Sequence, residues 1–360
     1  MTDMAASERR LERKAGLSAQ WHFSTGMIIV KTRNNLLLCF IALAILIAFP
    51  GAVRSQVVSS TLQNHSSDGY TLRVNANLVI LSTTVVDRHN ALVSGLSKED
   101  FQVYEDHILQ PIKHFSHEDI PVTVGLVIDN SGSMAPKRSD VIAAALSFAR
   151  SSNPRDQMFL VNFNEHVSYG LPADIPFTDR LDQLQLGLSD IKAIGETALY
   201  DAIAVALDQI KLGSCDKKVL ILISDGGDNA SKHNLAQVIE MARHSGAIIY
   251  AIGIFDEQDG DQNPDVLKRF AKETGGEAFF PDSSKETALI CERIAHDIRN
   301  QYTLAYIPIS TKQDGGYRVI DVKVNSASRG RLSARTRAGY FVPLMLPPPG
   351  IGTAAYDPHN

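Results

Sequence analysis

The stretch of residues 122–134 constrains the fold of this chain more than any other. It begins with an almost unbroken apolar run, Val-Thr-Val-Gly-Leu-Val-Ile, which stops abruptly at Asp129. Apolar runs without polar alternation are typical of a central strand that is covered on both faces. Two hydroxyl residues, Ser131 and Ser133, follow at once. The sequence therefore predicts a buried strand that delivers a loop of oxygen-bearing side chains.

The residues after this strand alternate between apolar runs and helical periodicity. We predict further strands at 158–163, 219–223, 247–255 and 277–280, a helix containing Ile142, Leu146 and Ala149, and helices at 182–191, 199–210, 235–244, 266–274 and 286–299. This rhythm indicates an α/β domain at residues 120–301 with a doubly wound, mostly parallel sheet and helices on both faces. Ligands bind such sheets at the carboxyl ends of the strands.

The segments on either side of this domain contain short apolar runs without helices. Strands are predicted at 78–86, 101–104 and 112–115, with a capping turn at 97–100, and again at 302–307, 317–324 and 332–341. Each segment is too small to bury a good core alone. We therefore expect residues 70–119 and 302–343 to pair into a second, smaller all-β domain.

The amino-terminal region has the composition of an export signal. Residues 36–49 are uncharged and apolar, and Lys31 and Arg33 precede them. This run is shorter than the roughly 20 residues that a membrane-spanning helix needs. We predict a signal peptide at 1–55 with a long leader, and Met27 is an alternative start. Membrane anchoring follows only if this segment stays uncleaved, and a buried helix is the remaining alternative.

The ends of the chain and its charge set further limits. The Ser-rich residues 56–69 are predicted to be a linker, and the Pro-rich residues 344–360 a disordered tail. The first 56 residues hold seven of the 35 Lys and Arg but only three of the 40 Asp and Glu, which leaves the remainder near −9. An acidic chain has no basic excess with which to neutralise phosphates, so nucleic-acid binding is disfavoured.

Cys215 and Cys291 are predicted to be two isolated buried thiols, with a disulfide as the alternative.

Two more oxygen-bearing residues follow predicted strands or begin helices. Thr197 lies at the start of the helix predicted at 199–210, and Asp225 lies at the carboxyl end of the strand predicted at 219–223. Taken singly, each is an ordinary helix cap or turn residue. Three such loops at one edge of a sheet favour a metal site instead.

These residues resemble the metal-ion-dependent adhesion site of von Willebrand factor A domains, a Rossmann-like family. The resemblance covers about residues 120–300, and the flanking segments 95–106 and 337–341 resemble the exported bacterial, acidobacterial-type VWFA-related group. It implies that the metal ligands are Asp129, Ser131, Ser133, Thr197 and Asp225. Glu196 departs from the family pattern, where Gly is common, and this carboxylate puts the polarity of the ligand in doubt.

The chemistry of the predicted ligands also indicates a divalent cation, independently of the resemblance. Hydroxyl and carboxylate oxygens are hard ligands that suit Mg²⁺, Mn²⁺ or Ca²⁺. Three neutral hydroxyls would leave the cation electron-poor, so it would favour an Asp or Glu carboxylate from a protein partner. A hydrolase would need a base, for which His166, Glu196 and Asp228 are the candidates by position, but no nucleophile or metalloprotease motif is present. The acidic residues 256–265 miss the EF-hand spacing and are predicted to be a solvated loop.

The sequence predicts one function and leaves two alternatives open. The first is an exported, non-enzymatic protein, secreted or in the periplasm or cell envelope, that captures a protein partner through the cation. The second is an envelope scaffold with a structural metal site. The third is a metal-dependent hydrolase.

Overall fold

A computed structural model describes residues 78–189, 192–255, 262–326 and 329–344. The predicted signal peptide, the linker, the first residues of the β segment and the tail beyond Leu344 lie outside this range. Most of the predicted acidic loop, residues 256–261, also lies outside it.

A six-stranded sheet forms the centre of the α/β region. Its order is β10-β9-β8-β5-β6-β7, and every neighbouring pair is parallel except β6 and β7. The strands are β5 (Val122–Asp129), β6 (Gln157–Phe163), β7 (Val167–Tyr169), β8 (Lys217–Ser224), β9 (Ile248–Gly253) and β10 (Ala278–Phe279). All eight residues of β5 are buried, as predicted for a strand that is covered on both faces.

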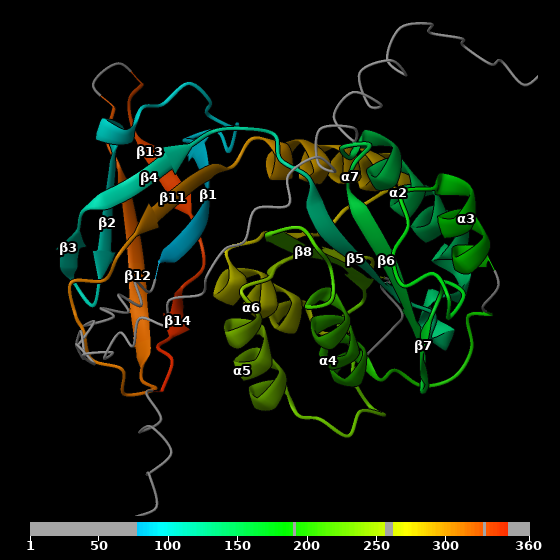
Figure 1. Ribbon diagram of the computed structural model, residues 1–360. Helices are drawn as coiled ribbons and strands as arrows, with labels where there is room; N and C mark the ends of the chain where they lie inside the picture. Colours follow the sequence, from blue (N-terminus) through cyan, green and yellow to red (C-terminus); the bar gives the residue numbers. More distant parts are fainter. Residues whose placement is uncertain (1–77, 190–191, 256–261, 327–328, 345–360) are drawn as a thin grey trace, which may run out of the picture. The chain divides into compact units, whose positions relative to one another are not determined.

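Helices cover both faces of this sheet (Figure 1). One set comprises α2 (Arg138–Ser151), α3 (Leu181–Ser189) and α7 (Ser284–Arg299), and the other α4 (Leu199–Ile210), α5 (Leu235–Ser245) and α6 (Pro264–Thr274). Helices α5 and α6 end at Gly246 and Gly275, whose positive φ angles of 67° and 85° suit glycine. The predicted α/β class with a doubly wound, mostly parallel sheet is confirmed.

Two antiparallel sheets combine strands from before and after the α/β region. Their orders are β13-β1-β11-β4 and β14-β12-β2-β3. The strands are β1 (Val79–Asp87), β2 (Phe101–Glu105), β3 (Ile108–Gln110), β4 (Ile112–Ser116), β11 (Tyr302–Tyr306), β12 (Tyr317–Val324), β13 (Leu332–Arg335) and β14 (Gly339–Phe341). Leu81, Val103 and Leu304 belong to the core between them, and none of these side chains is exposed. A short 3-10 helix (Lys98–Asp100) lies at the predicted capping turn, where the Ser97 N–H donates to the Asp100 carboxylate at 2.8 Å.

The prediction of one strand at 332–341 is wrong. Strand β13 pairs with β1 and strand β14 with β12, so the chain changes sheets between them. At the change, the Thr336 hydroxyl donates to the Ser82 carbonyl at 2.9 Å and the Ala338 N–H donates to the Glu273 carbonyl at 3.3 Å. Residues 336–338 therefore bond to other elements and do not form the hydrogen-bond ladder of one continuous strand. Strands β3 and β7 were not predicted, because three residues are too few to show periodicity.

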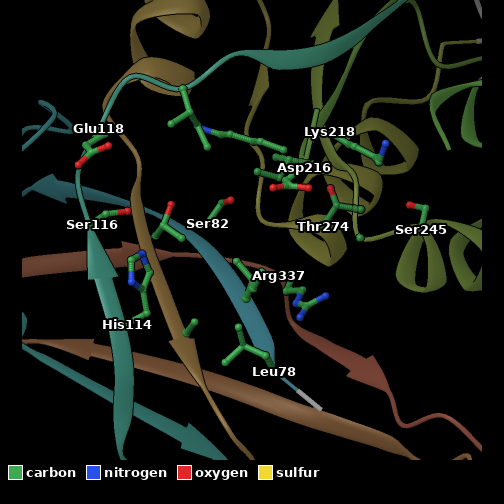
Figure 2. Close-up of a pocket in the computed structure, with 17 residues that line it drawn as sticks. Leu78, Ser82, His114, Ser116, Glu118, Asp216, Lys218, Ser245, Thr274 and Arg337 are labelled. Carbon is green, nitrogen blue, oxygen red and sulfur yellow. The ribbon is translucent and has the colours of Figure 1, made fainter. Parts of the chain in front are cut away.

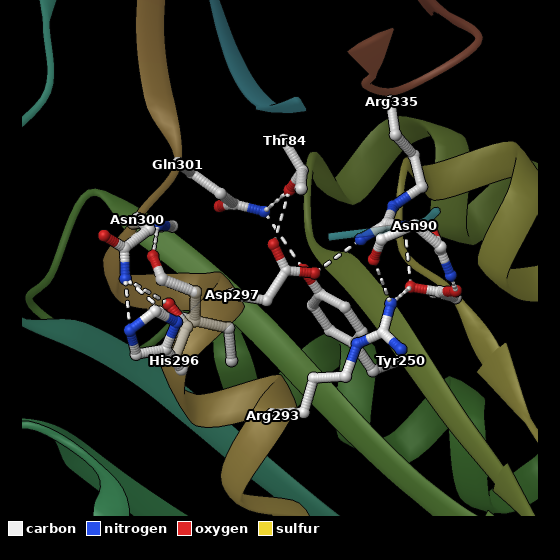
Figure 3. Close-up of polar contacts among 12 residues, drawn as sticks. Thr84, Asn90, Tyr250, Arg293, His296, Asp297, Asn300, Gln301 and Arg335 are labelled. Carbon is white, nitrogen blue, oxygen red and sulfur yellow. Dashed lines mark hydrogen bonds and ion pairs between the residues drawn. The ribbon is translucent and has the colours of Figure 1, made fainter. Parts of the chain in front are cut away.

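A buried polar network joins the α/β region to the first antiparallel sheet (Figure 3). The Asp297 carboxylate on α7 accepts hydrogen bonds from Thr84 on β1 at 2.8 Å and from the Tyr250 hydroxyl on β9 at 3.0 Å. Arg335 on β13 also donates to Asp297, and to Glu277 at 2.7 Å. Burial raises the pKa of Asp297, and the Arg335 charge opposes this effect. A buried charge that is paired and hydrogen-bonded in this way ties the four elements together.

The two cysteines of the described region are both free. Cys291 is buried in α7 and Cys215 is half-buried. Isolated thiols are therefore confirmed and the disulfide alternative is wrong, although Cys215 is less buried than predicted. Among the described residues, no helix combines the length and apolar character needed to cross a membrane.

Candidate metal centre

The candidate centre lies where β5 and β8 end. These strands are adjacent and parallel, and Ile128 is paired with Ile223 in their register. Asp129 is the last residue of β5, and Asp225 follows the last residue of β8. The carboxyl ends of parallel strands share one edge of the sheet, so two residues that are distant in sequence come together.

The loop after β5 is held by its own first side chain. The Asp129 carboxylate accepts the Ser131 N–H at 2.8 Å, a turn that Asp often forms with the backbone two residues on. This turn brings the Ser131 and Ser133 hydroxyl oxygens to 3.1 Å from each other. The Ser133 hydroxyl then donates to the Asp225 carboxylate at 2.5 Å. Four of the five predicted ligands thus form one continuous hydrogen-bonded set.

Thr197 approaches the same loop through the backbone. The Gly132 N–H donates to the Gly195 carbonyl at 3.0 Å, and the Ile194 N–H donates to the Asn130 carbonyl at 3.0 Å. The Thr197 N–H donates to the Asn229 side chain at 2.8 Å. Within the described residues, the Thr197 hydroxyl makes no hydrogen bond to the other four predicted ligands. The fifth residue is therefore adjacent to the set without being bonded to it.

Two residues of the site were missed by the sequence reasoning. The Ser224 hydroxyl donates to the second oxygen of the Asp129 carboxylate at 2.6 Å, and the Asn229 side chain holds the backbone of Thr197. Ser224 was visible only as the neighbour of Asp225, and the sole signal for Asn229 was its place in a turn rich in Gly and Asp. The direction of a side chain at the end of a strand depends on the register of the sheet. Residue types alone do not predict that direction.

The backbone after Asp225 needs glycine. Gly226 has a φ of +83°, and a Cβ atom there would lie 2.4 Å from the Asn263 carbonyl oxygen. The Gly226 N–H donates to the Ser224 hydroxyl at 3.0 Å, and the Gly227 N–H donates to the Asp225 carboxylate at 3.1 Å. The tight turn therefore fixes both Ser224 and Asp225.

Negative charge is concentrated at this site. Asp129 is 2% exposed and Asp225 is 3% exposed. Burial raises the pKa of Asp129 to about 6, the Asp225 charge adds to the effect, and hydrogen bonds from Ser131 and Ser224 oppose it. In the part of the chain that the structure describes, neither carboxylate forms an ion pair with a basic side chain. A hard divalent cation fits a set of two carboxylates and hydroxyls of this kind.

The described residues give less support to a site for a softer metal. No group of three or more His, Cys, Asp and Glu side chains suitable for a metal occurs among the described residues. Any cation held at this edge of the sheet would therefore depend on the hydroxyls of Ser131, Ser133 and Thr197 as well as on the carboxylates.

The three candidate bases differ in their surroundings. His166 and Glu196 are exposed. The Asp228 carboxylate accepts the Tyr200 N–H at 3.1 Å and the Ser231 hydroxyl at 2.5 Å, which ties the start of α4 to the neighbouring loop. A second exposed carboxylate, Glu165, lies against Gly195, since a Cβ atom at Gly195 would overlap it. The rim of the site thus carries two exposed glutamates.

One family model matches part of the chain. The family model of the von Willebrand factor type A domain matches residues 123–293, from β5 into α7, in agreement with the resemblance of this region to that domain. The resemblance of the flanking segments to the acidobacterial-type group stays a prediction. None of the curated proteins matches the chain significantly.

Several solved structures are similar to the chain. The von Willebrand factor type A protein from Catenulispora acidiphila has 13% identity and a TM-score of 0.46, and the alignment covers 68% of this chain and 73% of that one. The conserved hypothetical protein BatB from Bacteroides thetaiotaomicron has 16% identity and a TM-score of 0.37, with 49% and 98% covered. The vWF domain of the type V pili tip protein Mfa5 from Porphyromonas gingivalis has 16% identity and a TM-score of 0.43, with 50% and 95% covered.

Proposed function

We propose that this chain is an exported, non-enzymatic binding protein that captures an acidic group of a partner protein through a divalent cation. Asp129, Ser131, Ser133, Thr197 and Asp225 would hold the cation, with Mg²⁺ as the first choice and Mn²⁺ or Ca²⁺ as alternatives. The partner would supply an Asp or Glu carboxylate.

One observation carries this proposal. Asp129 and Asp225 are both buried, both lie in the hydrogen-bonded set at the edge of the sheet, and neither has a basic partner among the described residues. Two neighbouring buried carboxylates are unfavourable unless a positive charge compensates them. A bound divalent cation would provide that charge.

The remaining donors determine the chemistry that such a cation would supply. The hydroxyls of Ser131, Ser133 and Thr197 are neutral, so the cation would keep much of its positive charge and attract a further oxygen anion. The Ser133 hydroxyl donates to the Asp225 carboxylate, and this hydrogen bond positions two of the proposed metal ligands relative to each other. A carboxylate on a protein partner fits the remaining position.

The surroundings of the three candidate bases support binding over hydrolysis. The Asp228 carboxylate accepts hydrogen bonds from Tyr200 and Ser231, and His166 lies in a loop where its backbone N–H donates to the Asn164 side chain at 2.9 Å. A general base must reach the water that it activates. Among the described residues, no hydrogen bond joins the side chain of Asp228, His166 or Glu196 to a predicted metal ligand.

Export is proposed from the amino-terminal sequence. The uncharged run at 36–49 with its basic flank supports secretion or residence in the periplasm or cell envelope. The segments 95–106 and 337–341 support membership of the acidobacterial-type VWFA-related group.

Capture from the producing cell's own envelope tests the proposed function. The full chain is immobilised and exposed to envelope proteins in Mg²⁺ or in a chelator. The same is done with Asp225→Ala and with the matched control Asp174→Ala, which removes an exposed aspartate distant in sequence from the site. We expect Mg²⁺-dependent capture by the wild type and the control, and loss of capture by Asp225→Ala.

The identity of the contacting group is tested next. Replacing the Asp or Glu of a captured partner with Asn or Gln should abolish the interaction. Capture that survives chelation would support the scaffold alternative, and turnover of an ester, phosphate or peptide that requires Asp225 would support the hydrolase.

A further inference from the structure

A cavity of about 620 Å³ lies at the opposite edge of the six-stranded sheet (Figure 2). Lys217 and Lys218 at the start of β8 and Ile248 at the start of β9 line one side of it. Strands β1, β4 and β11 line the other side. Because the candidate metal centre is at the carboxyl ends of the same parallel strands, this cavity is a separate feature.

Small side chains of the antiparallel sheet form the floor of the cavity. Ser82, Thr303 and Ser116 are paired across β1, β11 and β4, so three hydroxyls form a row. A second row consists of Ile80, Ala305 and His114. In the described part of the chain, the hydroxyls of the first row have no hydrogen-bond partner. Short side chains leave the space open, and unpaired hydroxyls can still bond to a ligand.

Arg337 is the unusual residue of the lining. It lies between β13 and β14, where the chain changes sheets, and Figure 2 draws it among Leu78, Thr274 and Ser245. Its Nε atom is buried without a hydrogen-bond partner, and its guanidinium forms no ion pair with any described residue. The guanidinium carbon lies 5.4 Å from the centroid of the Tyr340 ring. Burial lowers the pKa of Arg337, as expected for a cation without an anionic partner.

The lining contains four other charged residues, Lys217, Lys218, Glu118 and Asp216. The Lys217 amine donates to the Ile298 carbonyl, and the Lys218 amine donates to the carbonyls of Ile210 and Gly213 at 2.9 and 3.0 Å. Glu118 and Asp216 also line the cavity, and Glu118 lies beside Ser116, away from Arg337 in this view. A ligand with a second anionic group would meet these acids, so the cavity favours a single negative charge.

We propose that this cavity binds a small organic carboxylate with an apolar body. The carboxylate would pair with the planar guanidinium of Arg337, which can donate two parallel hydrogen bonds. The apolar body would lie against Leu78, Ile80 and Ile248. The volume is within the usual range of small-molecule sites, about 300–1,000 Å³. Such a ligand would compensate the charge of Arg337, whose guanidinium forms no ion pair with any described residue.

Octanoate is a suitable probe, with octanamide as its neutral counterpart. Both are titrated into the full chain while the amide resonances of Thr303 and Gly246 are followed by NMR. The variants are Arg337→Gln, Ser116→Leu, which fills the cavity and keeps the arginine, and the exposed control Arg331→Gln. We expect octanoate to shift both resonances, and octanamide to bind at least about tenfold more weakly because it cannot form the ion pair.

The variants separate this site from general binding. Arg337→Gln and Ser116→Leu should each weaken octanoate binding by at least about tenfold, while Arg331→Gln leaves it unchanged. If Arg337→Gln does not fold, Ser116→Leu decides alone. The proposal is overturned if octanoate causes no shift up to about 10 mM, if octanamide binds equally well, or if Ser116→Leu binds like the wild type.

Discussion

The Ser133 hydroxyl donates a 2.5 Å hydrogen bond to the Asp225 carboxylate, although 92 positions separate the two residues in the chain. This bond joins the loop after β5 to the loop after β8. It depends on the adjacent, parallel arrangement of the two strands and on the turn at Gly226. The geometry of the candidate metal centre is therefore a property of the sheet edge as a whole.

Replacing Gly226 with Ala should destabilise the fold severely. A Cβ atom there would lie 2.4 Å from the Asn263 carbonyl oxygen, and the positive φ is itself unfavourable for alanine. Gly330→Ala is a matched control, because Gly330 also has a positive φ of 68° but has open space around its Cβ position. We expect a loss of about 1 kcal/mol for the control and at least about 3 kcal/mol for Gly226→Ala in urea unfolding. Equal losses would contradict this account of the turn.

Glu196→Gln should strengthen the capture of an acidic partner. Glu196 is exposed and lies next to Thr197, so its charge repels an approaching carboxylate. Removing one exposed rim charge should raise affinity by about twofold to fivefold at low salt, and the difference should shrink at high salt. The comparison uses Mg²⁺-dependent binding of the captured partner to both chains. A weaker interaction for Glu196→Gln would indicate instead that this carboxylate belongs to the binding set.

The two described thiols should differ sharply in reactivity. Burial raises the pKa of Cys291 to about 12, so its thiolate is negligible at neutral pH, while Cys215 is half-buried. The native full chain is labelled with a thiol reagent. Relative to the wild type, Cys215→Ser should incorporate one equivalent of reagent less, and Cys291→Ser should incorporate the same amount. A lost equivalent in Cys291→Ser under native conditions would mean that α7 opens readily.

Lys217 should make the fold more stable as pH rises from neutral. Burial lowers the pKa of Lys217 to about 8, against 10.5 for the unperturbed side chain. Between these values the unfolded chain holds the proton that the folded chain has released, so the free energy of unfolding increases with pH. This stabilisation is complete above the pKa that Lys217 has in the unfolded chain. It is lost as the pH falls through the pKa that Lys217 has in the folded chain.

Urea unfolding of the wild type and Lys217→Met isolates this effect from other titrating groups. Between pH 7 and pH 10, the wild type should gain up to about 3 kcal/mol relative to the variant. A difference that stays constant with pH would show that the Lys217 amine is solvated.

Much of the central sheet could be predicted from local pattern. The apolar run before Asp129 and the aliphatic run before Asp225 have no polar alternation, and this pattern predicts buried parallel strands whose ends meet. The same logic predicts that Asp129 and Asp225 lie close together, and the short spacing from Asp129 brings the hydroxyls of Ser131 and Ser133 to the same loop.

Other features depend on tertiary contacts that leave no local pattern. Residues 332–341 look like one strand, but the bonds of Thr336 and Ala338 to other elements divide them between two sheets. The hydrogen bond from Ser224 to Asp129 depends on side-chain orientation. The isolation of Arg337 could not be predicted either, because it is defined by the carboxylates that are absent around it in the described part of the chain.

Isothermal titration of Mg²⁺ and Mn²⁺ into the full chain tests the central claim most directly. It is performed on the wild type, on Asp129→Ala and on the exposed control Asp174→Ala. We expect saturable binding by the wild type and the control, and binding at least about 100-fold weaker in Asp129→Ala because a buried anionic ligand is gone. Equally weak binding by the wild type and Asp129→Ala would contradict the metal centre.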